Sequence, residues 1–197
     1  PRGSPCGQRA GARRTPRQNG PMVAASGSFV DEVAVALSRL PPDAFTAARD
    51  ERAAAADAAD AVHIKALRKP VVAAWAVNLL VADGQLAEAV ELAAALREAQ
   101  DDLGAAELRR LGAQRQQLVA SLANRAAALA AEAGHPLADS AREAVAQTIN
   151  AAVMDARAAA AVLTGRLRRP LGLGALDEFD AADVVAGSPP GETHERS

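Results

Sequence analysis

The sequence predicts an all-α protein, a multi-helix bundle, from three observations. Alanine, the residue with the highest helix propensity, accounts for 53 of the 197 residues. Apolar residues recur at intervals of three and four along most of the chain, and no segment alternates apolar and polar residues as a strand does. Only 2% of the residues are aromatic, so we expect closely packed helices around a core of Leu and Val.

Composition divides the chain into three parts. Residues 1–27 are rich in Gly, Pro, Ser and Arg and lack apolar periodicity, which predicts a disordered basic segment. Residues 28–171 should form a single all-helical domain, and residues 172–197 a disordered acidic tail. The N-terminal arginines fit a basic arm for nucleic acid or an upstream extension over residues 1–21. We favour the extension, because no aromatic residues are interleaved with these arginines.

Proline and acidic residues delimit the first helices. Ser28 caps a helix whose apolar residues keep helical spacing until the Pro41-Pro42 pair ends it. Asp43 then caps a second helix from residue 44 to about residue 59. A shorter helix, or a continuation of the second, covers residues 60–67.

The next helix is apolar on every side. Pro70 starts it at a first-turn position, where the missing N–H costs nothing. It runs to about residue 82, and Asp83-Gly84 ends it. Because a helix that is apolar all round is a buried one, we expect Trp75 to be an anchor of the core.

A long antiparallel helical hairpin is expected over about residues 85–133. Its first helix, 85–103, carries four apolar residues on a broad face: Leu86, Val90, Leu92 and Leu96. Its second helix follows Gly104 and should be roughly 40 Å long at about 1.5 Å per residue. That helix has the heptad leucines of a coiled coil, interrupted by two arginines: Leu108, Leu111, Leu118, Leu122 and Leu129, with Arg115 and Arg125.

Two more helices complete the predicted domain. Ser140 and Glu143 have the spacing of a capping box at the start of the first. Asp155 caps the last helix, over residues 156–164, and Gly165 ends it.

Charge and composition disfavour several classes of protein. Residues 31–197 hold 17 basic and 24 acidic residues, a net charge of −7, which disfavours broad binding to nucleic acid or anionic membranes. No apolar run reaches the roughly 20 residues of a membrane span. Cys6 is the only cysteine, so no disulfide framework forms within one chain, and we expect a cytoplasmic protein.

Catalytic signals are weak throughout. His63, His135 and His194 are scattered, and none has a second His or Cys at the spacing of metal ligands. His63 lies near Lys65 and fits a phosphate contact or, as we favour, an exposed helix residue. We therefore expect no catalytic residue, no metal, no cofactor and no enzymatic activity.

Two basic clusters are the candidate site for an anion or a partner. They consist of Lys65, Arg68 and Lys69, and of Arg166, Arg168 and Arg169. The first precedes the apolar helix, whose N-terminal N–H groups favour an anion. The clusters either meet in space as a phosphate-binding patch or, as we favour, pair with surrounding Asp and Glu.

Asn78 is the lone polar residue in the apolar helix. Burial would require hydrogen-bond partners for its amide. It either ties the helix to a neighbouring backbone, which we favour, or faces a ligand pocket.

The chain resembles an uncharacterised family of alanine-rich helical proteins from high-GC actinobacteria. The resemblance spans roughly residues 30–169. Its motifs are Phe45-Thr-Ala-Ala-Arg49, Lys65-Ala-Leu-Arg-Lys-Pro70 with Ala73-Ala-Trp-Ala-Val-Asn78, Leu96-Arg-Glu-Ala-Gln100 and Gly165-Arg-Leu167. Val71 stands where many relatives have Ser, which removes a hydroxyl contact. The resemblance implies domain boundaries but no activity.

These observations favour a non-enzymatic module that binds another protein. The partner could also be a second copy of the chain, in a homo-oligomer formed through the helical faces. The alternative is a nucleic-acid-associated protein that uses the Lys65–Lys69 and Arg166–Arg169 clusters. A membrane partner is not expected.

Overall fold

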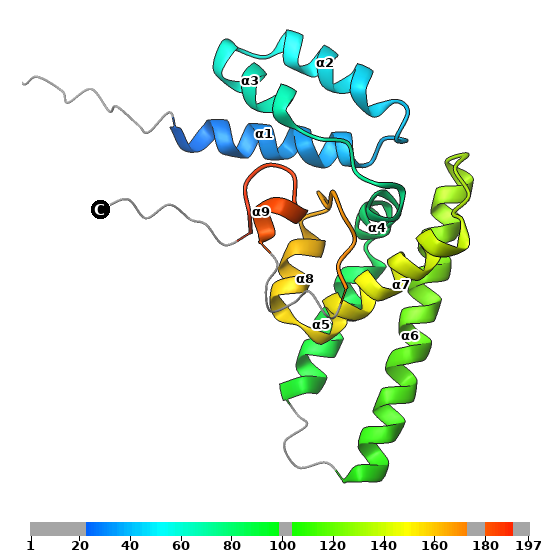
Figure 1. Cartoon of the computed structure of the whole chain (residues 1–197). Coiled ribbons are helices and arrows are strands. Elements are labelled where there is room, and N and C mark those ends of the chain that lie inside the picture. The colour runs from blue at the N-terminus through cyan, green and yellow to red at the C-terminus, as the bar shows by residue number, and fades with distance from the viewer. Residues whose placement is uncertain (1–22, 99–103, 173–179, 191–197) are drawn as a thin grey trace, which may run out of the picture.

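The computed structural model describes residues 23–98, 104–172 and 180–190. In these ranges helices are the regular structure, and an isolated antiparallel bridge joins Leu167 to Val185. The all-α multi-helix prediction is confirmed (Figure 1). The predictions of disorder for residues 1–22, 173–179 and 191–197 lie outside the described residues.

Three N-terminal helices form a small layer with its own core: α1 (Val23–Ser38), α2 (Phe45–Ala55) and α3 (Ala58–Ala66). Helix α1 begins at Val23, so the prediction that Ser28 caps it is wrong. Helix α2 ends at Ala55 because Asp57 starts a new helix, its side chain accepting the Asp60 N–H at 2.9 Å. Figure 1 shows this layer beside the larger bundle.

Helix α4 (Val72–Asp83) lies at the centre of the larger bundle, against α5, α6, α7 and α8. Trp75 is fully buried there, as predicted. Its indole N–H donates to the carbonyl oxygen of Arg39 at 3.3 Å, and its ring meets that of His135 edge-on at 5.6 Å. Pro70 lies before the helix and not in its first turn, because Val71 is the N-terminal cap.

Helices α5 (Gln85–Glu98) and α6 (Ala105–Glu132) are the two arms of the predicted hairpin, and they run in opposite directions (Figure 1). The two arms stand apart along much of their length. Helix α7 (Asp139–Met154) crosses both, and α5 packs more extensively on α7 than on α6. The last part of the predicted first arm, residues 99–103, lies outside the described residues.

The predicted side-chain cap is present at one of the last two predicted helices and absent at the other. Asp155 caps α8 (Ala156–Leu163) by accepting the Ala158 N–H at 2.8 Å. The capping box at Ser140 is wrong, because the N-terminal cap is Ala138, two residues earlier, and α7 already begins at Asp139. Helix α8 packs against α4, α5 and α7.

The chain returns to the core after residue 171, contrary to the predicted domain boundary. Helix α9 (Ala181–Val184) precedes Val185, and both Val184 and Val185 are buried in the larger core. The Arg168 N–H donates to the Val184 carbonyl oxygen at 2.7 Å. Ala186, the next residue, is buried in the core of the α1–α3 layer. Residues 184–186 therefore contribute to both cores.

Candidate functional site

The first predicted basic cluster lies on the surface between α3 and α4. Lys65, Arg68 and Lys69 are all exposed, and no salt bridge or side-chain hydrogen bond engages them within the described residues. The backbone is fixed here, because the Val71 N–H donates to the Arg168 carbonyl oxygen at 3.0 Å. The predicted pairing of these three cations with local carboxylates is therefore wrong for the described residues.

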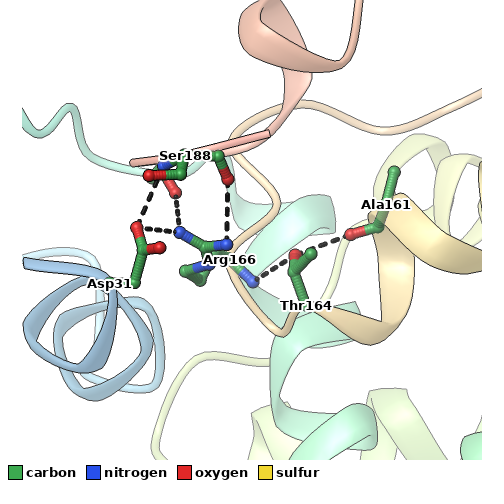
Figure 2. Close-up of polar contacts among 6 residues, drawn as sticks. Asp31, Ala161, Thr164, Arg166 and Ser188 are labelled. Carbon is green, nitrogen blue, oxygen red and sulfur yellow. Dashed lines mark hydrogen bonds and ion pairs between the residues drawn. The ribbon is translucent and has the colours of Figure 1, made fainter. Parts of the chain in front are cut away.

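Arg166, from the second cluster, is buried, and both terminal nitrogens of its guanidinium contact the protein (Figure 2). Its Nη1 contacts the Asp31 carboxylate of α1 and donates to the Ala186 carbonyl oxygen at 2.9 Å. Its Nη2 donates to the Ser188 carbonyl oxygen at 3.0 Å. Asp31 also accepts the Ser188 N–H at 2.9 Å. Arg166 thus holds three chain segments together, and it has no exposed face for an anion.

The other two arginines of that cluster differ from each other. Arg169 is exposed, and its Nη2 lies 4.0 Å from a carboxylate oxygen of Asp183. Arg168 is half-buried, and its Nε is inaccessible to solvent and lacks a hydrogen-bond partner within the described residues.

The two predicted basic clusters do meet, through one residue of each. Arg68 and Arg168 line the same surface groove, which has a volume of about 500 Å³, and His63 lines it as well. Apolar residues from α1, from the end of α3 and from the returning C-terminal segment form much of the wall: Val30, Ala66, Leu67, Ala182, Val185 and Ala186. Asp31 is the acidic residue of this lining, and Arg166 holds its carboxylate. We refer to this feature as the basic groove.

Asn78 is fully buried and ties α4 to the backbone of residue 167. Its amide Nδ2 donates to the Leu167 carbonyl oxygen at 2.9 Å, and its Oδ1 accepts the Leu167 N–H at 2.9 Å. Both ends of the amide are used, so Asn78 has the structural role that we favoured and does not face a ligand.

A second groove, between α5 and α6, has a volume of about 760 Å³ and was missed by sequence reasoning. Its apolar lining includes Leu92, Leu96, Leu108 and Met154, all of them exposed. The sequence placed Leu92 and Leu96 on one broad apolar face with Leu86 and Val90, but only the latter two are buried. We refer to this feature as the hairpin groove.

Two arginines lie among the apolar residues of the hairpin groove. Arg97 Nη1 donates to the Val153 carbonyl oxygen. Arg115 Nη1 lies 3.0 Å from the sulfur of Met154, a weak acceptor, and Arg115 Nε is buried without a hydrogen-bond partner among the described residues. The lining described here has no carboxylate, so the groove is apolar with a positive character.

Arg125, the other arginine in the heptad pattern of α6, has a structural role. Its Nη2 donates to Asp83 Oδ1 at 2.7 Å, joining α6 to the end of α4. This hydrogen bond, helped by the charge of the guanidinium, holds the pKa of Asp83 below its ordinary value of 3.8.

Comparison of the chain with protein-family models, curated proteins and solved structures finds no match. The resemblance drawn from the sequence motifs therefore stays a prediction. In the described ranges no three metal-ligating side chains gather in one place. None of the helices described is both long enough and apolar enough to cross a membrane.

Proposed function

We propose that this chain is a protein-interaction module whose hairpin groove binds an acidic amphipathic helix of another protein. The observation that carries this proposal is the pairing of exposed leucines with an under-coordinated arginine in one groove. Leu92 is 59% exposed and Leu108 47% exposed, on opposite walls. Apolar side chains that converge from two helices are the usual seat of a bound amphipathic helix.

The packing of α6 supports an external partner. Residues 105–118 form the first half of the helix, and every residue in that stretch is exposed or half-buried. The buried residues of α6 all lie in its second half: Val119, Leu122, Ala126, Ala127 and Ala130. The heptad leucines thus continue beyond the part of the helix that the bundle covers. A partner helix would complete the seam that Leu108, Leu111 and Leu118 begin.

Charge decides the kind of helix. The Arg115 guanidinium has a buried Nε without a partner among the described residues, and leaving such a group unpaired costs free energy. A carboxylate from a bound helix would supply the missing acceptor, and it would meet no acidic residue in the described lining. An acidic partner is therefore favoured over a basic one, and over a second copy of this chain, whose residues 104–118 carry three arginines and one glutamate.

The proposal assigns binding and not catalysis to the chain. Nucleic-acid binding is less well supported, because Arg166 is buried and Arg169 lies near Asp183. These two arginines cannot extend the exposed cations of residues 65–69 into a continuous basic surface.

Two synthetic helical peptides test the proposal. Both carry leucines at helical spacing; one has Glu and the other Lys at the remaining positions. Fluorescence anisotropy of the labelled peptides should show that the acidic peptide binds more tightly by tenfold or more. Leu108→Gln should weaken binding by about tenfold, a loss of roughly 1.4 kcal/mol. Val62→Gln, at an exposed valine of α3 outside the groove, is the control and should bind as the native protein does.

Three outcomes would overturn the proposal. The first is no binding of the acidic peptide, and the second is equal affinity for both peptides. The third is a dimer in sedimentation that Leu108→Gln dissociates, which would assign the groove to a second copy. Arg115→Gln separates charge from shape, because it should reduce the preference for the acidic peptide while leaving the apolar contacts in place.

A further inference from the structure

The basic groove lies apart from the hairpin groove and shares no lining residue with it. We propose that the basic groove binds a small phosphorylated ligand, with Arg68 and Arg168 holding the phosphate. The inference does not depend on the proposed function, because it rests on different residues.

The two arginines reach the groove from distant parts of the sequence. Arg68 lies in the link from α3 to α4, and Arg168 lies in the segment after α8. The bond between the Val71 N–H and the Arg168 carbonyl oxygen, at 3.0 Å, fixes these two segments side by side. A second backbone bond, from Arg168 N–H to the Val184 carbonyl oxygen, holds Arg168 on its other side. The arginines are thus placed by the fold and not by a flexible loop.

Neither guanidinium has a protein partner within the described residues. Arg68 is exposed, and its side chain makes no hydrogen bond or ion pair with any residue that the structure describes. Arg168 has an Nε that is removed from solvent and has no acceptor in the described part of the chain. A buried donor without an acceptor is costly, and such groups in native proteins often mark a site that a ligand completes. Phosphate oxygens are strong acceptors for arginine and suit its planar donor set.

The acidic residue of the groove does not compete for these arginines. Asp31 already interacts with Arg166 Nη1 and with the Ser188 N–H. Figure 2 shows this cluster, in which Arg166 points toward Asp31 and the chain at Ser188. Arg166 therefore neutralises the carboxylate, which leaves the charges of Arg68 and Arg168 free to attract an anion.

The dimensions and the walls favour a small organic phosphate over a nucleic acid. A volume of about 500 Å³ is within the usual range of small-molecule pockets, about 300–1,000 Å³. Val30, Leu67 and Val185 supply apolar surface for an organic group attached to the phosphate. Lys65 and Lys69, which a nucleic-acid backbone would need, are not part of the groove lining.

Thermal unfolding with two probes tests the site. Inorganic phosphate is the minimal ligand, and phenyl phosphate adds an apolar group. At ionic strength matched with NaCl, phenyl phosphate at roughly ten times its Kd should raise Tm by about 3–6 °C. Inorganic phosphate should act at higher concentration. Arg68→Gln, at an exposed residue, should remove most of both shifts without altering the Tm measured in NaCl.

Arg168→Gln should remove the shifts as well, and Arg168→Lys should restore part of them, because a charge remains without the planar donor set. Arg109→Gln, at an exposed arginine of α6 outside both groove linings, is the control and should retain the native shifts. Equal Tm in phosphate and in NaCl would overturn the proposal. So would an undiminished shift in Arg68→Gln, or tight binding of a single-stranded oligonucleotide that Lys65→Gln weakens. Failure here would leave the peptide experiment on the hairpin groove unaffected.

Discussion

Asn78 and Leu167 exchange two hydrogen bonds across the buried centre of the protein, each 2.9 Å long. The side-chain amide of Asn78 mimics a peptide group and satisfies both the N–H and the C=O of Leu167. The backbone of residue 167 is thereby held against α4 although it belongs to no helix.

Replacing Asn78 by Leu should therefore lower the free energy of unfolding substantially. The change keeps a similar side-chain volume but leaves the buried N–H and C=O of Leu167 without hydrogen-bond partners. Each unpaired group should cost about 1–3 kcal/mol. Chemical denaturation measures the loss. Asn124→Leu, at an exposed asparagine on α6, is the control and should change stability little. Equal effects of the two substitutions would contradict the role given to Asn78.

Trp75→Ala should cost about 3–5 kcal/mol, the usual range for a large buried aromatic side chain. The indole is fully buried, and it also donates to the Arg39 carbonyl oxygen and contacts the ring of His135. Because this is the only tryptophan, fluorescence reports on it alone. The emission maximum of the native protein should lie at a shorter wavelength than that of free tryptophan in water. A maximum at the same wavelength as free tryptophan would rule out burial.

Gly187→Ala should be strongly destabilising. Gly187 has a φ of +78°, and a Cβ there would overlap Asp31 Oδ1 and lie 2.6 Å from Arg166 Nη1. The substitution would separate the Arg166–Asp31 pair as well as strain the backbone.

Gly112→Ala is the same substitution at an unhindered glycine, and we expect it to raise stability. A Cβ at this helical position meets nothing within 4 Å, so the variant should gain about 0.5–1 kcal/mol from helix propensity. The difference in Tm between the two alanine variants is the measurement. Similar Tm values for both would show that the surroundings of Gly187 are not as tight as described.

The Asp83–Arg125 pair predicts a dependence of stability on pH. The pKa of Asp83 is below its ordinary 3.8 in the folded protein, chiefly because of the hydrogen bond from Arg125. The stabilisation is therefore present above the ordinary value and is lost as the pH falls through the lowered pKa. The Tm difference between the native protein and Arg125→Gln should shrink as acid is added across that window. A Tm difference between the two proteins that stays constant with pH would contradict a stabilising Asp83–Arg125 interaction.

Shortening the chain after residue 172 should destabilise it, whereas shortening it after residue 190 should not. The first change removes Val184 and Val185 from the core, for about 3 kcal/mol or more. It also removes the acceptors of Arg166 at Ala186 and Ser188. Thermal unfolding of the two shortened chains measures this difference. Equal Tm values would mean that residues 180–190 do not contribute to stability.

The sequence predicted features that local signals specify. The cap at Asp155, the turn at Gly84 and the burial of Trp75 all depend on residues within one or two helical turns, and all three are present. The periodicity of α6 also predicted its limits closely, from Gly104 to about residue 133.

Features that depend on distant residues were not predictable in the same way. Arg166 looked like part of a surface cluster, because its acceptors on α1 and at residues 186–188 are far away in sequence. The hairpin groove escaped notice for a related reason. Heptad leucines indicate that a helix has an apolar face, but not which part of that face the rest of the chain covers.

The sharing of residues 184–186 between two cores bears on how the chain folds during synthesis. Helices α1 to α3 leave the ribosome first, yet the small core that they enclose includes Ala186, which is translated long afterwards. Until then the nascent layer lacks both Ala186 and the arginine that holds Asp31. The earliest part of the domain therefore acquires its final stability only when one of its latest segments arrives.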